Sequence, residues 1–258
     1  MTVPIVLFGI LFTLMLLVGG KRGAKSFVAL CCNFATLFYM VFLIVSKFDS
    51  IIVTIIGSMI ITSVTLFYIN GVNEKTLSAF FSVMLVVFIT MLIAYRMGMS
   101  AQIQGFSVEQ EDVFDLPKYY IHISFARVVI CEMLLGLLGA IIDVAISISS
   151  SMNEIFLQNK RISKRKLLKS GFNIGKDILG TMTNTLFFAY IGGFMTLIIW
   201  FKFLAYSFEE IINSRIFVSE VFQVIAGGVG IILIIPTTAF ITVMILFRHK
   251  NTTRDLQI

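Results

Sequence analysis

Seven residues between positions 132 and 154 bring acidic, hydroxyl and glycine residues together at helical spacing. They follow one another in steps of four, three, four, four, three and four: Glu132, Gly136, Gly139, Asp143, Ser147, Ser150 and Glu154. Such steps keep side chains on one face of an α-helix. The surrounding residues are apolar, so three carboxyl groups lie along a segment that otherwise belongs in a lipid bilayer. This pattern is typical of residues that take up and release protons or cations during transport.

Asp143 is the leading candidate among them. It lies roughly nine residues, or ~14 Å of helix, from the expected inner end of its segment. An ionised carboxylate at that depth must be paired, hydrated or protonated. The nearest basic residue on the same segment is Arg127, on the outer side. We therefore expect Asp143 to carry a proton over part of the physiological pH range and to act as a coupling group. A polar packing role is the alternative.

Glu132, Glu154 and Asp177 are further candidates for proton or ion coupling. Each of them also has a simpler interpretation. Glu132 can form a structural ion pair with Arg127 near the outer interface. Glu154 and Asp177 can lie at the inner interface, where neighbouring lysines compensate their charge. The sequence leaves these alternatives open.

Two later segments carry comparable small or polar faces. The first comprises Asp177, Thr181, Asn184 and Gly192, and the second comprises Gln223, Gly227, Gly230 and Thr237. Small residues let helices approach one another closely, which turns polar groups toward a neighbouring helix and away from lipid. We therefore predict a polar seam between three helices. Its residues are Ser147, Ser150, Thr181, Asn184 and Gln223.

The composition excludes a soluble globular protein. Hydrophobic residues make up 58% of the 258 residues and charged residues 13%, whereas charged residues normally make up about a quarter of a soluble domain. The cysteines Cys31, Cys32 and Cys131 form no paired framework and no metal-binding spacing. The sequence also lacks a recognisable pair of nucleophile and base. We expect an integral membrane protein that is not an enzyme and that holds no metal and no cofactor.

Seven apolar runs are long enough to cross a bilayer, which requires ~20 residues each. They lie at about 3–20, 26–46, 51–71, 77–96, 123–152, 178–204 and 221–247. If the N-terminus is outside, 14 of the 20 basic residues fall in cytoplasmic segments, as the positive-inside rule requires. We therefore predict an all-α bundle of about seven spans with the N-terminus outside and the C-terminus cytoplasmic.

These spans form a single integral membrane domain, residues 1–258. Residues 1–96 contain four apolar spans, residues 97–121 form an acidic extracytoplasmic loop, and residues 122–258 contain three further spans. A basic cytoplasmic linker, residues 158–177, connects the fifth and sixth spans. Its charges alternate with apolar residues, which predicts an interfacial helix against anionic lipid headgroups. Nucleic acid is not an expected partner, because no aromatic stacking platform accompanies the charges.

Two stretches in the second half of the chain carry a family resemblance. They are GLLGAIIDVAISISSSMNEI (136–155) and GKDILGTMTNTLFFAYIGG (175–193). In this order and at this separation they resemble the signature regions of the YibE/F-like family of bacterial membrane proteins. The resemblance implies a multi-pass protein of the bacterial plasma membrane with no assigned biochemical activity. It also implies a longer relative, with an extracytoplasmic region, as a partner.

The same half of the chain is similar, more loosely, to the SecF half of the SecDF translocation aid and to membrane helices of proton-driven RND exporters. In those families a mid-membrane aspartate takes part in proton coupling, and Asp143 is the matching position. The chain departs from them because no large extracytoplasmic domain interrupts it; the segment 97–121 has 25 residues. This departure favours a half-unit that needs a partner over a complete exporter.

The leading hypothesis is a component of a secondary, proton- or cation-linked transporter or exporter. The alternative is a non-transporting scaffold or assembly subunit of a heteromeric complex, in which Asp143 bonds to Asn184 or to a polar group of another subunit. The expected partners are membrane lipids, a longer homologous membrane protein or a second copy of the chain, and a small solute or ion whose identity stays open.

Overall fold

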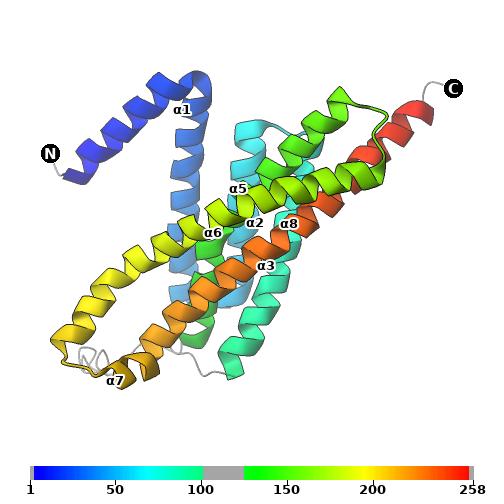
Figure 1. Ribbon diagram of the computed structural model, residues 1–258. Helices are drawn as coiled ribbons and strands as arrows, with labels where there is room; N and C mark the ends of the chain where they lie inside the picture. The colour runs from blue at the N-terminus through cyan, green and yellow to red at the C-terminus, as the bar shows by residue number, and fades with distance from the viewer. Residues whose placement is uncertain (1–2, 101–124, 256–258) are drawn as a thin grey trace.

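The computed structural model describes residues 3–100 and 125–255, and every regular element in them is a helix (Figure 1). The elements are α1 (Val3–Val45), α2 (Ser50–Ser63), the short π-helix η1 (Val64–Tyr68), α3 (Glu74–Ser100), α5 (Phe125–Gln158), α6 (Lys164–Phe203), α7 (Phe208–Asn213) and α8 (Arg215–Asp255). Six helical runs in this part of the chain are long and apolar enough to cross a bilayer. The predicted all-α membrane fold is confirmed. Most of the predicted acidic loop lies outside the described residues.

The first helical run contains two of the predicted spans. At 43 residues, α1 is much longer than the ~20 residues that cross a bilayer. It bends at Gly20, which has a φ of 55° and a ψ of −133°, a conformation open to glycine because it has no Cβ. The ring of Phe27 contacts the rings of Phe8 and Phe12 across the bend, at centroid distances of 5.0 and 4.6 Å. Figure 1 shows the two arms diverging from this point.

The core of the molecule lies where α3, α5 and α8 pack against one another. The residues of α5 that enter the core recur every three or four positions, as expected for one face of a helix. Its fully buried side chains include Leu134, Leu137, Ile141, Ile148 and Met152. Because lipid tails are as apolar as these side chains, close van der Waals packing, more than the hydrophobic effect, holds such helices together.

Helix α6 lies along α8, and two glycines permit the approach (Figure 1). A Cβ at position 175 would overlap the side chain of Ile235, and a Cβ at position 171 would lie 3.0 Å from the Cβ of Ala239. Between them, these two close approaches fix the first half of α6 against α8. Small residues at a helix crossing act in this way because they let the backbones come together.

The predicted basic linker is, for most of its length, the beginning of α6. Ser163 caps the helix by accepting a hydrogen bond from the backbone N–H of Lys166 (3.4 Å). The connection from α5 is therefore limited to residues 159–163. Leu167 on the apolar side of this segment is completely buried. Leu167 therefore packs on the protein, whereas the charged side of the segment is exposed. The glycines at 171 and 175 let α8 come close to this segment, and its contact with anionic lipid headgroups stays a prediction.

Successive helices run back and forth between two ends of the bundle. In Figure 1 the bend of α1, the connection between α5 and α6, and the C-terminal end of α8 all lie toward the top, and α7 lies at the bottom. The basic residues near Gly20, those of 160–169 and Arg248 consequently share one end. This grouping agrees with the positive-inside pattern. The direction of the chain relative to the membrane stays a prediction.

Candidate functional site on α5

The seven spaced residues of α5 occupy one side of the helix, which we call the acid face: Glu132, Gly136, Gly139, Asp143, Ser147, Ser150 and Glu154. The three acidic residues and both glycines are exposed, whereas Ser147 and Ser150 are half-buried. The opposite side of α5 supplies the core. The chain therefore buries the apolar side of α5 and leaves the acid face largely open.

Asp143 lies close to the middle of its membrane-spanning helix. The apolar run extends from Ala126 to Gln158, which places 17 residues before Asp143 and 15 after it. Among the described residues, the Asp143 carboxylate forms no hydrogen bond and no ion pair. One turn away, a Cβ added at Gly139 would meet no atom within 4 Å. The surface around Asp143 is therefore open to whatever lies beside α5 in the bilayer.

Three helices meet at the end of the acid face that carries Glu132. A Cβ at position 136 would lie 2.9 Å from Nε2 of Gln223 and 3.0 Å from the hydroxyl oxygen of Tyr190. Gly136 thus lets the side chains from α6 and α8 reach the backbone of α5. The Tyr190 hydroxyl is buried and has no hydrogen-bond partner in the described part of the chain. Of the predicted seam residues, Gln223 is the one brought against α5 here.

Two carboxylates border the same meeting point. Glu132 of α5 and Glu220 of α8 are close enough for their charges to interact, and both charges also act on Tyr190. Tyr190 and Glu220 were missed by the sequence interpretation. Glu220 precedes Gln223 by three residues and so extends the predicted face of the last span by one turn. Tyr190 gives no such signal, because it occurs among apolar residues.

The predicted polar face of α6 points elsewhere. Asp177, Thr181 and Asn184 are all exposed, and the Thr181 hydroxyl donates to the backbone oxygen of Ile178 on its own helix (2.9 Å). The side of α6 that faces α8 is the one carrying Leu186 and Tyr190; a Cβ at Gly227 would lie 2.6 Å from Leu186. The packing of the glycines and apolar side chains on α8 sets the rotation of α6. It leaves the polar side outward.

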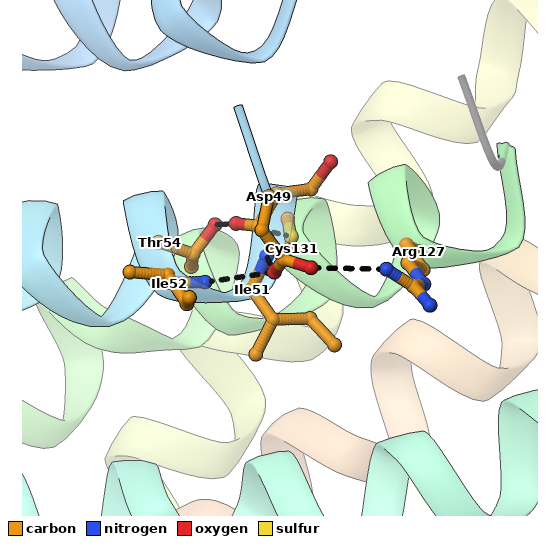
Figure 2. A network of polar contacts seen from close by, with 7 residues as sticks. Asp49, Ile51, Ile52, Thr54, Arg127 and Cys131 are labelled. Atoms are coloured by element: carbon orange, nitrogen blue, oxygen red, sulfur yellow. Dashed lines mark hydrogen bonds and ion pairs between the residues drawn. The ribbon is translucent and has the colours of Figure 1, made fainter. Parts of the chain in front are cut away.

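The partner of Arg127 is Asp49, and Glu132 plays no part in this ion pair (Figure 2). The guanidinium Nη1 lies 3.0 Å from the Asp49 carboxylate, on the turn between α1 and α2. The other carboxylate oxygen caps α2 by accepting hydrogen bonds from the backbone N–H groups of Ile51 (3.0 Å) and Ile52 (3.2 Å). Asp49 immediately precedes an apolar run, which is a sequence signal for a helix cap. The ion pair with a residue 78 positions away has no such local signal.

One turn after Arg127, α5 makes a second contact with the start of α2. The Cys131 thiol donates to the backbone oxygen of Ser50 at 3.2 Å (Figure 2). Cys131 is buried. Together with the ion pair, this contact joins the beginning of α5 to the beginning of α2. Glu132 makes no ion pair within the described residues and remains on the acid face.

The family model described as YibE/F-like protein matches residues 7–248 of the chain. That range includes almost all of the six apolar helical runs and the whole acid face. No curated protein and no solved structure matches the chain.

Proposed function

The chain belongs to the YibE/F-like family, and from this premise we propose that it is a component of a secondary, proton- or cation-linked transporter or exporter in the bacterial plasma membrane. Its six long apolar helical runs make it a multi-pass membrane protein. In the proposal, Asp143 is the coupling carboxylate, and Glu132, Glu154 and Asp177 are secondary candidates.

The observation that carries this proposal is the position of Asp143. An ionised aspartate at the centre of a membrane helix costs roughly 2.5–3.5 kcal/mol on insertion scales, and more in contact with hydrocarbon. Within the described residues nothing pairs with it. Taking up a proton or binding a cation removes the charge that is costly at this depth. That property is what a proton- or cation-coupling residue needs.

A second subunit would complete the site. Gly139 is exposed one turn from Asp143, and a Cβ there would meet no atom within 4 Å. A glycine at such a position allows a neighbouring helix to approach closely enough to shield a carboxyl group from lipid. The partner is a longer homologous membrane protein or a second copy of this chain. The transported solute or ion would pass along the acid face between the two subunits.

Proton flux in proteoliposomes tests the proposal. The chain is purified in mild detergent with whatever copurifies, reconstituted, and loaded with a pH-sensitive dye. We expect Asp143→Asn to abolish flux and Asp143→Glu to retain part of it. Glu209→Gln is the control and should leave flux unchanged, because Glu209 is an exposed acid on α7, outside the six long apolar helical runs. Unchanged flux in Asp143→Asn, with normal assembly, would contradict the proposal.

The scaffold alternative is supported by a different feature of the same face. An exposed glycine beside an acid, here Gly139 beside Asp143, also suits static helix packing, in which Asp143 would accept hydrogen bonds from another subunit. Access of water separates the two functions. A thiol introduced at Ser147 and modified by a small water-soluble reagent in the assembled complex favours transport, whereas complete protection favours a scaffold.

A further inference from the structure

A groove with basic side chains at its edge lies where α6 begins and α8 ends. It consists of two adjoining cavities of about 310 and 390 Å³, and both are lined by Lys164 and Met244. The first cavity also has Arg165 at its edge and Leu168, Phe240 and Val243 along its wall. The second extends past Lys164 toward Arg248. Cationic groups from two helices thus border a wall that is almost entirely apolar.

The charges of Lys164 and Arg165 are available to a ligand. The ammonium of Lys164 lies 5.6 Å from the centroid of the Phe247 ring, which holds it at the boundary between the two cavities. Neither Lys164 nor Arg165 forms an ion pair within the described residues. Phe240 and Met244 are 58% and 60% exposed. An occupant would therefore meet unpaired cations at one end and exposed apolar surface along its length.

We propose that this groove is a specific binding site for one anionic phospholipid. The headgroup phosphate would lie at Lys164 and Arg165, in the first turn of α6, where the free backbone N–H groups of a helix N-terminus also favour an anion. An acyl chain would lie along Phe240 and Met244. Each basic residue near a membrane surface strengthens the binding of an anionic lipid by about fivefold.

The apolar wall selects a lipid over a soluble phosphate. A free anion would use the cations and leave the exposed Phe240 and Met244 without a function, whereas a phospholipid complements both parts of the groove. The groove also lies at the end of the bundle that carries the basic segments, which the positive-inside pattern assigns to the cytoplasmic leaflet. Anionic lipids are enriched in that leaflet.

Tryptophan quenching by brominated lipids provides the test. The sequence contains a single tryptophan, Trp200, which is exposed near the other end of α6. A Met244→Trp, Trp200→Phe variant places the reporter in the groove. Its quenching is measured in vesicles that contain brominated phosphatidylglycerol or brominated phosphatidylcholine. The unmodified protein, reporting from Trp200, measures the lipid preference outside the groove.

We expect stronger quenching by phosphatidylglycerol at position 244 and little preference at Trp200. Adding Lys164→Gln and Arg165→Gln should reduce the preference at position 244 by about fivefold per charge removed. Lys166→Gln with Lys169→Gln is the matched control, since both residues are exposed and removing them takes away the same charge without altering the groove. Equal quenching by the two lipids at position 244 would overturn the proposal. So would a preference that survives Lys164→Gln with Arg165→Gln, or one that both pairs of substitutions remove equally.

Discussion

Two polar helix faces differ in burial: the one on α2 is buried inside the bundle, and the one on α5 is largely exposed. The hydroxyl face of α2, made of Thr54, Ser58 and Thr62, is completely buried. Thr54 and Thr62 donate to backbone oxygens four residues earlier, at 2.8 and 2.6 Å. The acid face of α5 has the same helical periodicity, but its carboxylates are exposed and, within the described residues, Asp143 is unpaired.

This difference in burial reflects which polar side chains can find a hydrogen-bond partner within their own membrane helix. A hydroxyl both donates and accepts, so it can bond to its own helix and then pack inside the bundle. An ionised carboxylate only accepts, and the backbone N–H groups in the interior of a helix are already used. Hydroxyl faces can therefore close within one chain, whereas an acid face needs a donor, water or a proton from elsewhere. In the proposed assembly, a partner subunit would supply that donor to the acid face.

We expect the largest change in stability from substitutions on α6, where Gly175 packs against α8 and Gly180 does not. Gly175→Leu forces a side chain into Ile235 and should lower the free energy of unfolding by roughly 1–3 kcal/mol, or prevent folding. Gly180→Leu is the control, because a Cβ there meets no atom within 4 Å. Thermal unfolding of the purified proteins in detergent measures both. Equal tolerance of the two leucines would show that α6 does not pack on α8 through Gly175.

We expect a smaller difference in stability between variants of Asp49, which has a partner, and of Asp143, which has none within the described residues. Asp49→Ala removes the cap of α2 and the ion pair with Arg127, and should lower the free energy of unfolding by about 1–2 kcal/mol. Asp143→Ala should change it by less than ~0.5 kcal/mol, since the side chain has no partner within the described chain. Denaturant titration of each variant compares them. A larger loss for Asp143→Ala would mean that α5 is held by its acid face.

The hydroxyl face offers a still smaller test. The Ser58 hydroxyl is buried without a hydrogen-bond partner among the described residues, so Ser58→Ala should be neutral or stabilising by ~0.5 kcal/mol. Thr54→Val removes a made hydrogen bond and should be slightly destabilising, by up to about 1 kcal/mol. The melting temperatures of the two variants decide the order. The reverse order would place an unseen partner at Ser58.

The smallest effect is a pH dependence outside the membrane-spanning helices. Hydrogen bonds from the Ser207 backbone N–H (2.6 Å) and hydroxyl (2.8 Å) hold the pKa of Glu210 below its usual value. The stabilisation of α7 is therefore fully present above the unfolded pKa of about 4.3. It is lost as the pH falls through the lowered pKa of the folded protein.

Hydrogen exchange of the α7 amides between pH 3 and 6 measures this loss. Ser207→Ala should weaken protection of α7 and reduce its dependence on acid, because the backbone N–H of residue 207 still binds Glu210. Glu210→Gln should remove the dependence. Protection in the unmodified protein that does not change with pH would contradict the role assigned to Glu210.

The sequence predicts what depends on local periodicity. The class of fold, the apolar runs and the alignment of Glu132, Asp143 and Glu154 on one side of a helix all follow from spacing along one segment. That spacing does not determine whether another helix of the chain packs over the side that carries these three acids. Packing of α3 and α8 against the apolar side of α5 leaves the surface around Asp143 open.

Contacts between distant segments account for the rest. Arg127 pairs with Asp49 because two helix ends meet, and nothing near either residue indicates the other. The rotation of α6 is similarly set by Gly171 and Gly175 against α8, which turns Asn184 outward and Tyr190 inward. Only one side of α6 can face α8. The close contacts of Gly171 and Gly175 put the side with Tyr190 there and leave Asn184 exposed.

The lipid exposure of Gly139 tests whether the acid face is covered by a partner or lines an aqueous path, as proposed. A Gly139→Cys variant, in a background without Cys31, Cys32 and Cys131, can carry a spin label without a clash inside the chain. Its accessibility to oxygen is measured in bilayers containing the copurified assembly and compared with a label at Ile232, an exposed residue of α8. If the acid face is covered by a partner or lines an aqueous path, the label at 139 will be much less accessible to oxygen than the label at 232. Equal, high accessibility at both positions would show that the acid face lies against lipid and would contradict the proposed role of Asp143.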